Sequence, residues 1–174
     1  EPESGQLTVF VQQADGTLGP GKTFPTLTGI SELAVGDWDG DDRPEIFVLS
    51  VDERQIGLTR FDRGGRVAFP KVLPIEGRPL VMDVGVLNPN GKLALAVISD
   101  LDGKRELQIL EEGGKLRRQA LNASFKSNPK SITIHDANQD GLNDVVVLIP
   151  YEKIKVLVQV PDKDFVEADI APPG

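Results

Sequence analysis

Residues 33–50 read Leu33-Ala-Val-Gly-Asp-Trp-Asp-Gly-Asp-Asp-Arg-Pro-Glu-Ile-Phe-Val-Leu-Ser50. A mixed apolar run leads into a loop dense in Asp, and a continuously apolar run follows it. Short apolar runs bounded by turn residues are typical of β-strands, and a continuously apolar run predicts a strand that is covered on both faces. We therefore expect two strands joined by an acidic loop, with neighbouring sheets on both sides.

Two later stretches, residues 82–99 and 132–149, align with this one without a gap. The position of Asp37 is taken by Val86 and then by Asp136, which lie 49 and 50 residues further along in turn. A period of about 50 residues matches the blade of a β-propeller, whereas leucine-rich and ankyrin repeats have periods of roughly 20 to 35. The repeat therefore predicts propeller blades.

Each period contains four short expected strands. The first strands are expected at 30–35, 80–84 and 132–134, the second at 46–49, 93–98 and 145–149, and the third include 106–109 and 154–156. Upstream, a strand at 7–11, a turn at 14–16 and a further short strand supply only half a blade. We expect an all-β fold, a single partial β-propeller domain of about three and a half four-stranded blades, with a half-blade at 6–28 and blades at 30–75, 79–123 and 130–171.

An arc of this size cannot close a ring, since propellers typically have four to eight blades. Left open, it would expose an apolar sheet face at each end, which soluble monomers avoid. The one methionine is Met82, so residue 1 is not a translation start. We therefore expect the chain to be a piece of a longer parent that supplies the remaining blades.

The two acidic loops, called here the first Asp loop (37–45) and the second Asp loop (136–144), carry oxygen-bearing side chains at positions one, three, five and nine. At position seven, Arg43 and Leu142 would each add a backbone carbonyl. The expected ligands are thus Asp37, Asp39, Asp41, Arg43 and Glu45 in the first loop and Asp136, Asn138, Asp140, Leu142 and Asp144 in the second. Calcium takes six to eight oxygen ligands. The pattern predicts two Ca²⁺ sites, one in each loop.

The corresponding middle loop (86–94) has Val86 and Ala94 in place of the first and last carboxylates, so we expect a turn there but no calcium. Its turn is predicted from Pro89 and Asn90-Gly91. Position six is Gly141 in the second Asp loop, where a sharp bend is needed, but Asp42 in the first. Because the first Asp loop has more carboxylates, we expect it to bind calcium at least as tightly as the second, unless backbone strain at Asp42 cancels the advantage.

Two rival interpretations of the loops agree less well with the sequence. An EF-hand would place Glu at position twelve, but that position is Val48 in one loop and Val147 in the other. Asp, Asn and Gly also make ordinary turns, yet a nine-residue pattern recurs here in register. Four carboxylates packed together without a cation would also repel one another. These points favour calcium.

The motif Asp-x-Asp/Asn-x-Asp-Gly-x-x-Asp between two strands resembles the FG-GAP or VCBS-type repeats of integrin α-chain propellers and many secreted bacterial proteins. The repeat pattern covers nearly the whole chain, with departures at Asp42, at Glu45 and throughout the middle loop. The resemblance implies that calcium braces the loop between the first and second strands of a blade.

Composition excludes several classes of protein. The net charge of −8 and a pI near 4.7 disfavour nucleic-acid and anionic-membrane partners. No cysteine is present, which excludes disulfides and thiolate metal sites, and no apolar run approaches a membrane span. The single histidine, His135, has no nucleophile placed beside it by the sequence, and Trp38 is expected to pack against a neighbouring blade more readily than to contact a ligand.

The function expected from these features is that of a secreted or cell-surface calcium-binding scaffold for protein or glycan interaction and adhesion, without enzyme activity. The alternative is a non-catalytic segment of a secreted propeller enzyme such as a polysaccharide lyase. A lectin would show aromatic residues in register between the blades, and the seven Phe, one Trp and one Tyr are out of register.

Overall fold

The computed structural model describes residues 4–88, 90–121, 125, 127–151, 154–161 and 163–168. Within these residues the chain folds into fourteen β-strands, with no α-helix. None of the described residues forms a helix long and apolar enough to cross a membrane. Pro89 of the middle loop and the expected blade ends at 123 and 171 lie outside the described residues.

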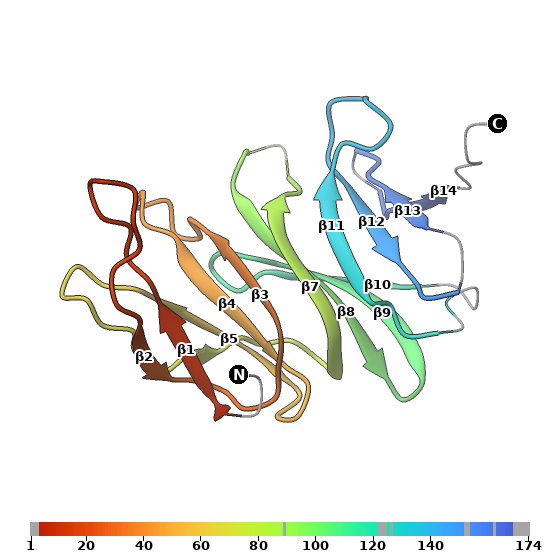
Figure 1. Cartoon of the computed structure of the whole chain (residues 1–174). Coiled ribbons are helices and arrows are strands. Elements are labelled where there is room, and N and C mark those ends of the chain that lie inside the picture. The colour runs from red at the N-terminus through yellow and green to blue at the C-terminus, as the bar shows by residue number, and fades with distance from the viewer. Residues whose placement is uncertain are drawn as a thin grey trace.

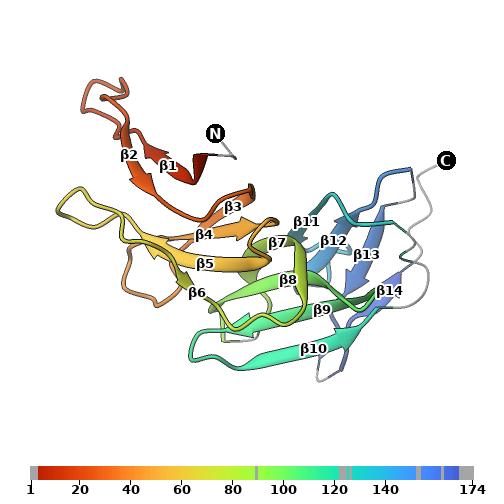
Figure 2. The same cartoon turned by 90° about the horizontal axis from the view of Figure 1, so that it is seen from below.

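The strands form one two-stranded and three four-stranded antiparallel sheets, in each of which consecutive strands are neighbours. The first sheet has β1 (Gln6–Val9) and β2 (Lys22–Pro25). The second has β3 (Ile30–Gly36), β4 (Glu45–Ser50), β5 (Gln55–Arg60) and β6 (Lys71–Val72); the third has β7 (Arg78–Val86), β8 (Leu93–Leu101), β9 (Lys104–Glu111) and β10 (Leu116–Ala120); the fourth has β11 (Ser131–His135), β12 (Asp144–Leu148), β13 (Lys155–Val158) and β14 (Val166–Ala168). The sheets stand side by side in an arc (Figures 1 and 2). The predicted all-β fold of four-stranded blades is confirmed.

The second strands β4 and β8 lie in the core because sheets pack on both of their faces. The last sheet differs: β12 packs against the preceding blade through Val145 and Val147, while Leu148 is 44% exposed, so the prediction of two covered faces is wrong for this strand. In β8, Leu95 and Val97 join Phe47 of the preceding blade in one apolar cluster. The alternate residues, among them Ala96 and Ile98, join a second cluster with the following blade. Successive side chains of a strand point to opposite faces, so β8 is apolar at every position from Leu93 to Ile98, as its sequence predicted.

Glycine lies at the end of β3 (Gly36) and one residue before the end of β7 (Gly85), where each of these first strands approaches the next four-stranded blade. A Cβ added at Gly36 would lie 2.6 Å from Leu93 Cδ1, and one added at Gly85 would lie 2.8 Å from Ile134 Cγ2. The third repeat has His135 at this position, and its side chain is exposed. The small residue therefore serves the close approach of consecutive blades.

Side-chain hydrogen bonds also join consecutive first strands. A Glu32 carboxylate oxygen accepts from the Met82 backbone N–H at 2.7 Å, and Asp83 accepts from the Ile134 N–H at 2.8 Å. The buried Gln108 amide both donates to the Glu76 carbonyl and accepts from its N–H.

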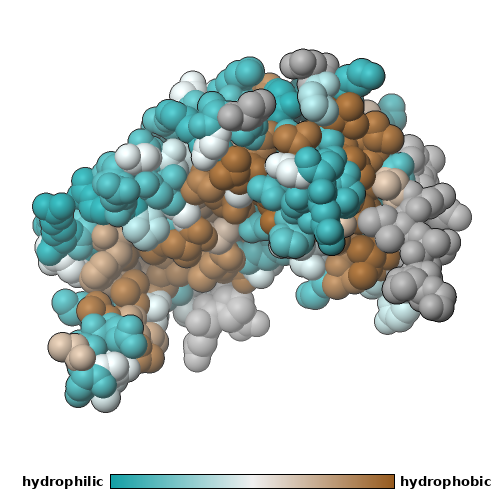
Figure 3. Space-filling view, turned by 90° about the horizontal axis from the view of Figure 1, so that it is seen from above, coloured by the Kyte–Doolittle hydropathy of each residue, from teal (hydrophilic) through white to brown (hydrophobic). Residues whose placement is uncertain are grey.

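The space-filling view from above shows hydrophilic residues along the rim and apolar surface between them (Figure 3).

Candidate metal-binding loops

The three loops that join the first and second strands of the four-stranded blades lie at the same edge of the arc (Figure 1). The first Asp loop connects β3 to β4, the middle loop connects β7 to β8, and the second Asp loop connects β11 to β12. In the middle loop the Asn90 side chain accepts from the Lys92 N–H and Gly91 adopts a φ of 72°. The prediction of a turn from Asn90-Gly91 is thus confirmed for the described part of the loop.

Both Asp loops place two residues in the left-handed region, at positions four and six. The φ angles are 74° at Gly40 and 63° at Asp42 in the first Asp loop, and 63° at Gln139 and 89° at Gly141 in the second. The sequence indicated position six alone. Glycine has no steric penalty in this region, and it occupies position four in the first Asp loop but position six in the second. Aligning the two sequences therefore does not reveal that the loops share one backbone conformation.

The carboxylate at position one organises each loop by accepting backbone hydrogen bonds. Asp37 accepts from Gly40 at 2.9 Å, from Asp41 at 3.1 Å and from Asp42 at 3.0 Å. Asp136 accepts from the N–H groups of residues 140 and 141 at 3.1 and 2.9 Å. The two loops therefore have the same internal frame although their side chains differ.

The acidic residue at position nine is buried in both loops. Glu45 is 3% exposed and accepts from the Trp38 N–H at 2.8 Å, while Asp144 is fully buried and accepts from the Ala137 N–H at 3.0 Å. Trp38 packs edge-on against Phe47 in the core, with ring centroids 5.4 Å apart. The same cluster contains Leu95 and Val97 of the next blade, so Trp38 lies in the packed interface with a neighbouring blade, as expected.

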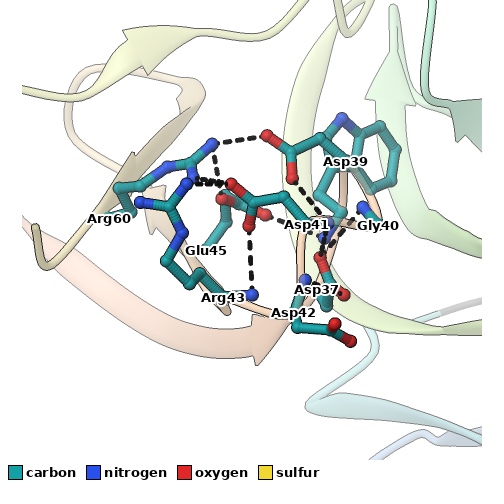
Figure 4. Close-up of polar contacts among 9 residues, drawn as sticks. Asp37, Asp39, Gly40, Asp41, Asp42, Arg43, Glu45 and Arg60 are labelled. Carbon is teal, nitrogen blue, oxygen red and sulfur yellow. Dashed lines mark hydrogen bonds and ion pairs between the residues drawn. The ribbon is translucent and has the colours of Figure 1, made fainter.

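The side chains of Asp37, Asp39 and Glu45 bring carboxylate oxygens within 4.8 Å of one another (Figure 4). Among the described residues this is the group of three or more acidic, His or Cys side chains that could hold a metal ion. Glu45 Oε1 is buried and accepts no hydrogen bond. Its charge partner is the Arg60 guanidinium, whose Nη2 lies 2.9 Å away, so this buried oxygen already faces a cation and is a carboxylate oxygen of the kind that binds calcium.

Asp41, the expected ligand at position five, lies beside two arginines. Its Oδ2 contacts Arg43 Nη2 at 2.6 Å and Arg60 Nη1 at 2.8 Å. Burial would raise the pKa of Asp41, but the hydrogen bonds from Arg60 and Arg43 outweigh it and lower that pKa. Arg43, expected to offer its carbonyl, donates its backbone N–H to Asp41.

Arg60 is the residue of this site that the sequence did not indicate. It lies on β5, directly opposite Glu45 in the β4–β5 register. Its guanidinium bonds Asp39 and Asp41 and lies 2.9 Å from Glu45 Oε1 (Figure 4). These hydrogen bonds to Asp41 and Asp39 raise the pKa of Arg60, and they reduce the repulsion that argued for a metal ion.

The second Asp loop differs in how its side chains are satisfied. The Asn138 amide donates to Asp140 Oδ2 at 2.8 Å, and Asp144 Oδ1 accepts from the Gln159 N–H at 3.0 Å. Leu142, expected to offer its carbonyl, donates its N–H to Asp140 at 2.8 Å. In the second Asp loop, side-chain and backbone donors thus hydrogen-bond to the carboxylates at positions five and nine. In the first Asp loop the carboxylates at the same two positions contact Arg60.

The fold and loops define the class: an all-β protein of four-stranded antiparallel blades with acidic loops between first and second strands. Residues 2–48 match the model of the FG-GAP-like repeat. The match ends within β4, just after the first Asp loop, so the predicted resemblance is confirmed for this part of the chain. Comparison with curated proteins finds no significant match.

Proposed function

We propose that this chain is a calcium-binding β-propeller scaffold, secreted or exposed at the cell surface, whose blade edge presents a rigid surface to a protein or glycan. The observation that carries the proposal is the convergence of Asp37, Asp39 and Glu45 at one point of the first Asp loop. The same backbone frame recurs in the second Asp loop, which supports a second site there.

The chemistry of the donors supports calcium among the biological cations. Calcium and magnesium prefer oxygen ligands, and calcium accepts the irregular, higher coordination that a flexible set of carboxylates and carbonyls provides. In the first Asp loop the ion would be held by Asp37, Asp39 and Glu45. In the second it would be held by Asp136, Asn138, Asp140 and Asp144.

The extracellular setting is part of the proposal, and the affinity typical of calcium sites in extracellular modules supports it. Calcium sites of extracellular modules commonly have Kd values of about 10⁻⁴–10⁻³ M. Sites of that strength are filled at the millimolar calcium found outside cells and remain empty in the cytosol. We propose a binding role without catalysis.

Further blade strands are proposed as partners within a larger ring. Leu33 and Val35 on β3 are 53% and 62% exposed, whereas the alternate residue Ala34 packs on the next blade. In the described part of the chain, β1 pairs only with β2, so its other edge is free to extend that sheet. Two additional strands there would complete a blade and cover Leu33 and Val35.

Calorimetric titration of calcium into chelator-treated protein, with thermal melts in calcium and in EDTA, tests the proposal. Two binding events and a higher Tm in calcium are expected. Asp37→Asn should remove one event and Asp136→Asn the other, while Asn90→Asp in the middle loop serves as a control that should create none. Absence of heat and of any Tm shift in the unmodified protein would refute calcium binding.

A further inference from the structure

Resting on the proposed calcium site, we propose that Arg60 is the resident counter-cation of the first Asp loop. Its guanidinium balances the carboxylates while no metal is bound, and a metal ion must displace it. The first Asp loop is therefore the weaker of the two calcium sites, although it carries more carboxylates.

The contacts show that Arg60 competes for the oxygens that a metal would use. Two residues of the metal cluster, Asp39 and Glu45, are also partners of the guanidinium. The pairing of β4 with β5 places Arg60 directly opposite Glu45, and this strand register keeps the guanidinium beside the loop. A metal bound to the same oxygens would face a like charge at close range, which disfavours binding.

Comparison of the three repeats shows that Arg60 belongs to the first Asp loop alone. In the middle repeat, Ala94 pairs with Glu111 at the corresponding place. In the last repeat Val145 pairs with Leu157, and continuing that register puts Val158 opposite Asp144. The first Asp loop, which has a carboxylate at position three where the second has Asn138, is thus the loop whose position nine pairs with an arginine on the neighbouring strand.

Counting charges removes the expected advantage of the first Asp loop. It contains five carboxylates and Arg43, so adding Arg60 leaves a net charge of −3. The second Asp loop contains three carboxylates and no Lys or Arg, which is also −3. Arg60 is 32% exposed at the side chain, so it can swing toward solvent when an ion enters, and the competition shows as reduced affinity rather than as complete exclusion.

The test exchanges the two residues that face the loops. Arg60→Val copies the second Asp loop, and Val158→Arg copies the first. Calcium affinity is measured by calorimetry at one loop at a time, with the other disabled by Asp37→Asn or Asp136→Asn, and Tm is measured in EDTA and in calcium. Arg60→Gln accompanies Arg60→Val, so that a failure of the valine variant to fold does not end the test.

We expect Arg60→Val to tighten calcium binding at the first Asp loop by about tenfold or more, the change that loss of roughly one charged hydrogen bond would produce. It should also lower Tm in EDTA and enlarge the Tm rise on adding calcium. Val158→Arg should weaken the second Asp loop and leave the first unchanged.

Unchanged or weaker binding at the first Asp loop in a folded Arg60→Val or Arg60→Gln protein would overturn the role of Arg60, while calcium binding itself would stand. Tighter binding at the first loop than at the second in the unmodified chain would also overturn it. If neither loop binds calcium in any variant, both the scaffold proposal and the competition fail.

Discussion

Replacing Gly85 with alanine tests whether glycine is needed where two blades meet. The new Cβ would lie 2.8 Å from Ile134 Cγ2 and 2.9 Å from Ile134 Cβ, and the Cβ of Ile134 is held by its own backbone. Gly85 does not have a positive φ, so the cost is steric. Overpacking costs about 1–3 kcal/mol, and the reduced freedom of the unfolded alanine chain offsets about 0.4–1 kcal/mol of it.

At the middle of these ranges the net loss is about 1.3 kcal/mol, which corresponds to a Tm lower by roughly 3–5 °C for a domain of this size. Gly36→Ala is the matched control, because its Cβ would meet mainly Leu93 Cδ1, the movable end of a side chain, and should cost less. Urea unfolding and calorimetric melts measure both. If Gly85→Ala is as stable as the unmodified protein, or costs the same in an Ile134→Gly background, which removes the opposing Cβ, then blade packing does not explain the glycine.

Three further outcomes are expected. Burial raises the pKa of the Glu32 carboxyl group; the negative charge of Asp83 also raises it, while Lys130 lowers it. The folded protein therefore binds the Glu32 proton more tightly than the unfolded chain does. The free energy of unfolding accordingly falls as pH rises from about 4 through the raised pKa. Glu32→Gln should accordingly melt higher than wild type at pH 7 and no higher at pH 3.5, and an equal difference at both would contradict the charge argument. Gln108→Ala leaves the N–H and C=O of Glu76 without their partner and should cost about 2–4 kcal/mol in urea unfolding, whereas a loss below 1 kcal/mol would mean that water replaces the amide. Gln139→Gly relieves a φ of 63° without changing charge and should raise stability by up to about 1 kcal/mol, a prediction that a lower Tm in EDTA would refute.

Much of the fold follows from local patterns in the sequence. The continuously apolar run at 93–98 predicted a doubly covered strand, and β8 is buried on both faces. The period of about 50 residues predicted the blades, because each blade repeats the same order of strands and turns. The backbone frame of the Asp loops could be predicted as well, since the hydrogen bonds within each loop join residues no more than seven apart.

The sequence alone therefore determined the strands, the repeat and the acidic loops, all of which depend on near neighbours and on the two-residue period of a strand. The tertiary structure decided which charges meet. Arg60 lies fifteen residues beyond Glu45 and reaches it only through the β4–β5 register, while Gly85 meets Ile134 only because two blades pack face to face. Contacts of this kind depend on how strands pair and sheets stack, and no spacing along the chain encodes them.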